Sequence, residues 1–168
     1  MPVKSAVKKV ITLLAALVVC WLISSVIAYH TASGVQGWYA GLVKPVFSLP
    51  LSAFSPIWTF SFLFMGLSLY LILQAGLKKH EVLPGFILFV LQLLLIIVWS
   101  YAFFNLHSLF LAFMCIIALW AALLCAIIQI FRFSVGSGMP LIPYFFLVCY
   151  LTYINYGIMV LNNATFTL

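Results

Sequence analysis

The stretch LPGFILFVLQLLLIIVWSYAFF, from Leu83 to Phe104, contains no charged side chain and is typical of one continuous apolar helix. At a rise of about 1.5 Å per residue, a helix of about 20 residues spans the roughly 30 Å hydrocarbon core of a bilayer. Because that core offers no water to the backbone, a continuous helix is the structure that satisfies the N–H and C=O groups. We therefore predict a transmembrane helix here.

Four other apolar runs of similar length accompany this stretch. Short segments rich in charged, polar, Gly or Pro residues separate the runs, as expected of turns between helices. The five runs cover residues 10–29, 57–77, 83–104, 109–131 and 141–161. The sequence therefore predicts an all-α integral membrane protein, a single domain over residues 1–168 in which five transmembrane helices form a bundle.

The first connection, residues 30–56, is too long for a simple turn. It contains aromatic and proline residues, among them Trp38, Tyr39, Pro45 and Pro50. Loops of this length in a compact domain are uncommon and are often functional. We predict that this connection folds into a structured lid.

The composition excludes a soluble protein. Hydrophobic residues make up 68% of the chain and charged residues 5%, with a mean hydropathy of +1.35, whereas a soluble domain carries about 25% charged residues. The net charge of +6 comes from seven basic residues and a single acid, Glu81. The basic residues lie singly or in small groups beside apolar runs. They therefore indicate contact with membrane lipid and argue against nucleic acid as a partner.

The basic residues are distributed unevenly between the two ends of the predicted bundle. Those on one side are Lys4, Lys8, Lys9, Lys78, Lys79 and Arg132, and only Lys44 falls on the other. Basic segments beside membrane spans stay preferentially on the cytoplasmic side. The asymmetry predicts an N-terminus inside and a C-terminus outside. A bacterial cell membrane is the expected location, with the mitochondrial outer membrane as the alternative.

Residues for acid–base or metal chemistry are scarce. Paired catalytic carboxylates require two acids, and the chain has one. The three histidines, His30, His80 and His107, lie in three different connections, and the four cysteines show no spacing typical of a metal site. The sequence therefore indicates no catalytic residue and no metal ligand, and it requires no cofactor.

Aromatic and amide side chains remain as candidates for function. Helical spacing groups Trp58, Phe62 and Met65 in the second segment, Gln92, Ile96, Trp99 and Phe103 in the third, and Tyr144, Thr152, Asn155 and Asn162 in the fifth. Gln92 and Asn155 need polar partners at membrane depth, so both are expected to point into the bundle. Either they only hold helices together, or they orient a large, flat, mostly apolar ligand that stacks on aromatic faces. The spacing leaves both interpretations open.

Several motifs resemble those of the translocator protein family, also called the tryptophan-rich sensory proteins (TspO). The segment WYAGLVKPVFSLPLSAFSPIW, residues 38–58, is similar to the family signature WYxxLxKPxWxPPxxxFxxxW. The other matching residues are Met65, Gly66 and Tyr70 in the second helix, Gln92, Trp99, Ser100, Phe103 and Phe104 in the third, and Pro143, Tyr144 and Asn155 in the fifth. The resemblance covers nearly the whole chain.

Five positions depart from the family pattern. Phe47 replaces the loop tryptophan, and Leu49 replaces the first proline of the pair. Ile96 stands where the family has Asn, Leu147 where it has Trp, and Leu151 where it usually has Ala. In the family, those last three positions contribute to the pocket that receives porphyrins and isoquinoline ligands. We therefore expect a less polar and narrower pocket, and the missing tryptophan argues against light-dependent porphyrin breakdown.

The resemblance implies a five-helix bundle, commonly a homodimer, whose first loop caps a ligand cavity. The implied function is binding of a tetrapyrrole, such as porphyrin or haem, or of another hydrophobic small molecule, for transport, sensing or disposal. The alternatives are a porphyrin-degrading enzyme and a structural membrane protein that acts by binding a partner. The expected ligand-binding residues are Trp38, Tyr39, Trp58, Phe62, Gln92, Ile96, Trp99, Phe103, Leu147, Leu151 and Asn155.

Overall fold

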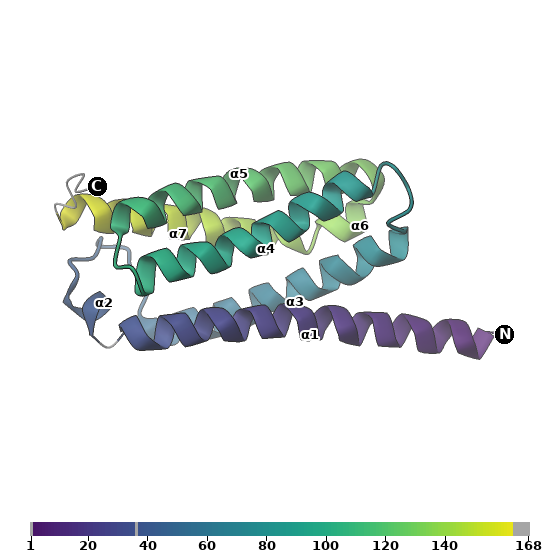
Figure 1. The fold of residues 1–168 in the computed structure, drawn as a ribbon, viewed down its shortest axis with the longest axis horizontal. Coiled ribbons are helices and arrows are strands. Elements are labelled where there is room, and N and C mark those ends of the chain that lie inside the picture. The colour runs from purple at the N-terminus through teal and green to yellow at the C-terminus, as the bar shows by residue number, and fades with distance from the viewer. Residues whose placement is uncertain (1, 36, 163–168) are drawn as a thin grey trace.

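The computed structural model describes residues 2–35 and 37–162, and within these ranges the chain is a bundle of helices with no strand (Figure 1). The long helices are α1 (Pro2–Val35), α3 (Leu51–Ala75), α4 (Leu83–Phe104), α5 (Leu109–Phe133) and α7 (Leu141–Leu161), and the short ones are α2 (Trp38–Gly41) and α6 (Val135–Gly138). Five helices of the described part of the chain are long and apolar enough to cross a membrane. The predicted all-α fold with five such helices is confirmed.

The five long helices form a closed ring of neighbours. Helix α1 packs on α3 and α4, α5 packs on α4 and α7, and α3 packs on α7. The short helix α6 lies against α5 and α3, whereas α2 lies at the opposite end of the bundle, beside the C-terminal end of α7 (Figure 1). A ring of this kind encloses one interior, and the buried apolar side chains of all five long helices meet there.

Helices α1 and α3 approach each other closely at a glycine. A Cβ added to Gly66 would lie 2.8 Å from the side chain of Leu17 and 3.1 Å from its Cα. Only a residue without a side chain permits this backbone approach, as is common between membrane helices. Gly66 of the sequence motif therefore permits the close contact between α1 and α3.

Several helix bounds differ from the sequence-based ranges, because hydropathy marks the hydrocarbon-spanning part of a helix and not its full length. Helix α1 runs beyond 10–29 at both ends. Helix α3 begins at Leu51, and Pro56, the last residue of the predicted connection, lies in its second turn. The same helix stops before 77, because Gly76 adopts a positive φ of 98°. Helix α5 extends two residues past 131, to Phe133, with Arg132 in its last turn.

The first connection is shorter than the predicted loop 30–56, since α1 and α3 both continue into it and α2 occupies part of the rest. Hydrogen bonds join it to α7. The hydroxyl of Tyr150 accepts from the amide N–H of Leu49 at 2.7 Å and donates to the carbonyl of Phe47 at 3.2 Å. The amide of Asn162 bonds both backbone groups of Val43, at 3.0 and 2.9 Å.

Candidate functional site

A partly open cavity of about 450 Å³ lies at the end of the bundle that holds α2, and three of its lining residues, Ala28, Ala32 and Thr59, are exposed at the surface. Residues of α1, α2, α3, α4 and α7 form its wall. They are Ser24, Ile27, Ala28, Thr31, Ala32, Val35, Tyr39, Trp58, Thr59, Trp99, Phe103, Phe104, Leu151, Ile154 and Asn155. The lining is mostly apolar and carries no charged side chain among the residues described. Such a lining is typical of pockets for hydrophobic ligands.

Aromatic rings form one side of this cavity. The rings of Trp99 and Phe103 are stacked, with centroids 5.8 Å apart and planes at 29°, and Phe104 meets Trp99 edge-on at 6.2 Å. Tyr39, from α2, lies 6.0 Å from Phe103 and 6.1 Å from Phe104. Helix α4 therefore supplies a packed aromatic wall, and the first connection extends this wall through Tyr39.

Helix α1 supplies a further part of the wall, which the sequence-based site missed. Its lining residues share one helical face, because they follow one another at intervals of three or one. They are Ser24, Ile27, Ala28, Thr31, Ala32 and Val35. Four of them are Ser, Ala or Thr, and their small side chains leave the space that the cavity occupies. This row of small residues on one face of α1 is the sequence pattern that could have indicated the contribution of α1 to the cavity.

Two side chains of the wall bury polar atoms that have no hydrogen-bond partner among the described residues. They are the Nε1 of Trp99 and both amide atoms of Asn155. Trp99 is 5% exposed and Asn155 is 1% exposed, so bulk water does not solvate them. Asn155 points into the bundle, as its position in an apolar helix suggests.

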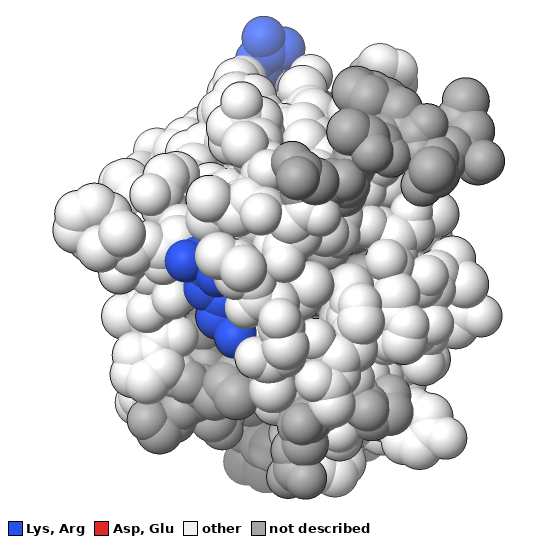
Figure 2. Space-filling model, turned by 90° about the vertical axis from the view of Figure 1, so that its left-hand side faces the viewer, with Lys and Arg blue, Asp and Glu red and all other residues white. Residues whose placement is uncertain are grey.

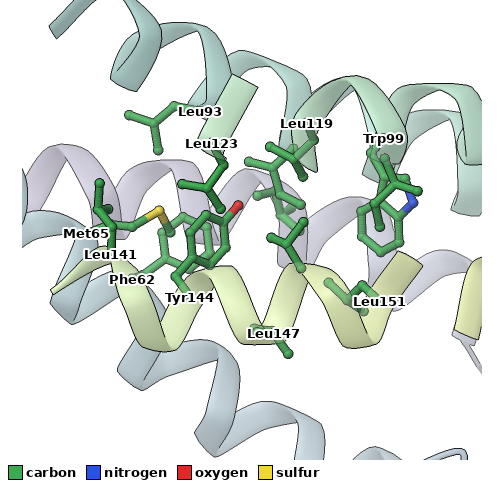
Figure 3. Packing of buried hydrophobic residues seen from close by; sticks show 14 of the residues in the cluster. Phe62, Met65, Leu93, Trp99, Leu119, Leu123, Leu141, Tyr144, Leu147 and Leu151 are labelled. Atoms are coloured by element: carbon green, nitrogen blue, oxygen red, sulfur yellow. The ribbon is translucent and has the colours of Figure 1, made fainter. Parts of the chain in front are cut away.

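The structure brings six of the expected site residues to the cavity wall: Tyr39, Trp58, Trp99, Phe103, Leu151 and Asn155. It places the other five elsewhere: Trp38, Phe62, Gln92, Ile96 and Leu147. Four of these five are core residues, buried in the bundle: Phe62, Gln92, Ile96 and Leu147. Figure 3 shows Trp99 and Leu151 at one end of the row of core side chains, with Phe62, Met65 and Tyr144 at the other.

Gln92 shows why helical spacing misled. It lies seven residues before Trp99 on α4, and at about 1.5 Å per residue this separates the two by about 10 Å along the axis. The Nε2 of Gln92 lies 3.7 Å from the sulfur of Met65, so this amide links α4 to α3 away from the cavity. Of the two interpretations of Gln92, a contact that holds helices together and a contact that orients a ligand, the structure agrees with the first.

Trp38 packs outside the cavity, against the connection between α4 and α5. Its ring stacks on His107 at 4.5 Å and 25°, and it meets Phe103 edge-on at 5.3 Å. Trp38 therefore packs against Phe103 without lining the cavity. It also holds α2 against the C-terminal end of α4 and the connection that leads to α5. Its neighbour Tyr39 is the residue of this pair that lines the cavity.

Tyr39 also lines a second hollow, which is formed by residues of the first connection. That hollow is lined by Tyr39, Ala40, Lys44, Ser48, Leu49 and Pro50. The Nζ of Lys44 lies 4.7 Å above the Tyr39 ring and within 3.3 Å of the carbonyl of Leu42. Burial, and then the nearby Tyr150, raise the pKa of Tyr39, so its hydroxyl stays protonated and neutral at physiological pH.

Comparison with known proteins agrees with this architecture. The TspO/MBR family matches residues 14–161. The chain is 32% identical over 155 residues to the tryptophan-rich protein TspO of Chlorobaculum tepidum, covering 92% of this chain and 98% of that protein. It is 33% identical over 135 residues to the tryptophan-rich protein TspO of Archaeoglobus fulgidus, covering 80% of this chain and 86% of that protein. The resemblance carried by the loop and helix motifs is thus confirmed: the chain is a multi-pass integral membrane protein and belongs to the TspO/MBR family.

Proposed function

We propose that the protein binds flat, mostly apolar small molecules of the tetrapyrrole class in this cavity, for their transport, sensing or disposal. The observation that carries the proposal is the cavity of about 450 Å³, whose described lining is uncharged and combines aromatic side chains of α2, α3 and α4 with small side chains of α1. Ligand pockets usually measure about 300–1,000 Å³ and are lined mainly by apolar and aromatic residues. The family resemblance supports the class of ligand.

The wall offers the contacts that a flat macrocycle requires. Trp58 and Trp99 approach the cavity from α3 and α4, and a ring that stacks on an indole face gains about 0.5–1.5 kcal/mol beyond the burial of its area. Ala28 and Ala32 of α1 line the same cavity and, being small, leave room in it. A planar ligand would therefore lie between α1 and the aromatic wall.

We also propose how the bundle is oriented. The described basic residues outside the first connection all lie at the end of the bundle opposite α2. They are Lys8 and Lys9 in the N-terminal part of α1, Lys78 and Lys79 in the connection between α3 and α4, and Arg132 in the last turn of α5. The end with α2 has few basic atoms and no acidic ones on its described surface (Figure 2). An inside N-terminus would place the cavity near the outer face of a cell membrane.

The proposal is tested by titration of the purified protein, in detergent micelles, with protoporphyrin and with haem. Quenching of tryptophan fluorescence reports binding, since Trp58 and Trp99 line the cavity. Saturable quenching by one ligand per chain supports the proposal. Quenching that rises linearly with ligand, as in empty micelles, contradicts it.

A matched pair of variants locates the binding. Ala28→Phe fills the cavity from α1, whereas Val26→Phe adds a ring on the same helix at a position that is 44% exposed and does not line the cavity. We expect Ala28→Phe to abolish saturable binding and Val26→Phe to leave it intact. Equal effects of the two substitutions would place the ligand elsewhere.

A further inference from the structure

The part of the first connection that follows α2 runs along the C-terminal turns of α7. The backbone of Val43 is bonded to the side chain of Asn162, which directly follows the last residue of α7, and the amide of Leu49 is bonded to the hydroxyl of Tyr150. At about 3.6 residues per turn, Tyr150 lies about three turns before the end of α7. The segment from 43 to 49 therefore leads from the end of the apolar span toward the middle of the bundle.

This course places a basic residue and two exposed apolar residues at different depths. Lys44 follows Val43, so it lies where the apolar span of α7 ends, which is the level of the lipid headgroups. Val46 and Phe47 come later in the segment, on the hydrocarbon side of Lys44, and are 95% and 76% exposed. A cation at headgroup level with apolar side chains below it matches the two parts of a phospholipid.

The backbone of the segment is satisfied as a water-poor environment requires. Side chains of α7 bond both backbone groups of Val43, the carbonyl of Phe47 and the N–H of Leu49, and the N–H of Ser48 donates to the carbonyl of Pro45 at 3.0 Å. Segments that contact lipid need such internal partners, because hydrocarbon offers none. The segment can therefore lie against lipid at little cost.

The ammonium group of Lys44 is held in a defined position. Its Nζ donates to the carbonyl of Leu42 at 3.3 Å and to that of Ala40 at 3.4 Å, and it lies 4.7 Å above the ring of Tyr39. An ammonium group has three donors, so one is left for a ligand. The same hollow is lined by two residues that carry hydroxyl groups, Tyr39 and Ser48.

The chain itself supplies no anion for Lys44. Its single acid, Glu81, lies in the connection between α3 and α4, at the opposite end of the bundle. Figure 2 shows no acidic atom on the described surface of the end that holds α2. The charge of Lys44 is therefore complementary to an anion from outside the chain, and at this level of the membrane that anion is a lipid phosphate.

We propose that the first connection binds an anionic phospholipid, whose phosphate contacts the ammonium group of Lys44 and whose acyl chains lie against Val46 and Phe47. The site lies on the connection, and it requires no ligand in the cavity between the helices.

Cross-linking from position 46 tests this proposal at the site itself. Val46→p-benzoylphenylalanine carries a benzophenone that, on illumination, inserts into C–H bonds of molecules that touch it. The full chain is placed in nanodiscs that contain equal amounts of phosphatidylglycerol and phosphatidylcholine with the same acyl chains. The mass of the cross-linked chain identifies the lipid, and the measurement is the ratio of the two adducts.

We expect phosphatidylglycerol adducts to exceed phosphatidylcholine adducts about fivefold, the ratio that about 1 kcal/mol for one basic residue near the membrane surface gives. Lys44→Gln should lower this ratio to about one. Lys79→Gln is the matched control, since it removes a basic residue at the opposite end of the bundle, and it should leave the ratio unchanged. The same benzophenone at Leu94, which is 55% exposed on α4, should give a ratio of about one.

Each contrary result overturns a stated part of the proposal. Lipid adducts from position 94 but none from position 46 would show that the connection does not touch acyl chains. A ratio of about one at position 46 would show that the connection has no preference for an anionic lipid, and a fivefold ratio kept in Lys44→Gln would show that Lys44 is not the cation. If the variant at Val46 does not fold, the same substitution at Phe47 decides the question. No tetrapyrrole is present, so the result does not depend on the proposed function.

Discussion

Pro45 of the first connection lies directly against Gly157 of α7, and a Cβ at position 157 would overlap the proline ring. Pro45 is buried, although its neighbours in the connection are largely exposed. The hydrogen bonds of Tyr150 and Asn162 hold the same segment to α7 on either side of this contact. The first connection is therefore fixed to α7 by one packing contact and by the hydrogen bonds of two side chains, Tyr150 and Asn162.

Gly157→Ala should release the first connection from α7. The added methyl group forces Pro45 away, and overpacking of this kind costs typically about 1–3 kcal/mol. Hydrogen–deuterium exchange at the amide of Val43, which donates to Asn162 at 3.0 Å, reports the release. We expect exchange there to become at least fivefold faster, because opening becomes easier by about 1 kcal/mol or more.

Gly136→Ala is the control for this substitution. No atom lies within 4 Å of a Cβ added to Gly136, which belongs to the short helix α6 at the other end of the bundle. Exchange at Val43 should stay unchanged in that variant. Unchanged exchange in Gly157→Ala would show that the contact with Pro45 does not hold the connection.

Tyr150→Phe should make the part of the first connection around Leu49 easier to open and leave the part around Val43 unchanged. The substitution removes the hydroxyl that accepts from the amide of Leu49 and donates to the carbonyl of Phe47. A net loss of about 1 kcal/mol for these bonds predicts exchange at Leu49 that is about fivefold faster. Exchange at Val43 should change little, because its partner Asn162 is kept.

Tyr153→Phe serves as the matched control, since Tyr153 lies on the same helix and is 48% exposed. It should leave exchange at both amides as it is in the unmodified protein. Equal acceleration at Leu49 and Val43 in Tyr150→Phe would mean instead that the connection opens as one unit.

The helix bundle could be predicted from the sequence because its signal is composition over a long window. An apolar run such as 83–104 can be recognised without knowledge of the residues it packs against, and in the structure α4 runs from Leu83 to Phe104. The helix ends were less predictable. A helix such as α1 continues beyond the hydrocarbon-spanning run, where the residues need not be apolar.

The site was harder to predict, because helical spacing gives the face of a residue and not its depth. Ile96 and Trp99 share a face of α4, yet only Trp99 reaches the cavity. The contribution of α1 was missed for a different reason. Ala28 and Ala32 contribute to the cavity by being small, whereas the sequence-based prediction rested on large aromatic and amide side chains. The residues of α7 that hold the first connection could not be predicted either, because they are defined by tertiary contacts such as that between Pro45 and Gly157.

The orientation in the membrane can be checked with reporters fused at two points. A reporter after Leu168 should lie outside and one at Lys79 inside, because helices α4, α5 and α7 provide three crossings between them. Alkaline phosphatase is active only outside a bacterial cytoplasm and green fluorescent protein only inside, so the pair gives opposite readings. Both fusion points reading as the same compartment would contradict a five-span topology.

Leu151→Ala should enlarge the cavity and tighten the binding of large ligands. Leu151 lines the cavity and is 4% exposed, so its truncation adds room beside Trp99. We expect the affinity for protoporphyrin to rise about threefold to tenfold, since a larger part of the macrocycle can leave water, at about 25 cal/mol per Å² of apolar surface. Leu147→Ala is the matched control: it removes the same atoms one turn earlier on α7, outside the cavity, where Leu147 is 6% exposed.

Both leucine substitutions should lower the melting temperature, because a buried Leu→Ala change costs about 2–5 kcal/mol. Only Leu151→Ala should combine this loss with a gain in affinity, measured by fluorescence titration at a temperature where both variants remain folded. This combination is informative because a general loosening of the bundle would change the affinity of both variants in the same way. A gain in affinity from Leu147→Ala that equals the gain from Leu151→Ala would show that the ligand does not occupy the cavity beside Trp99.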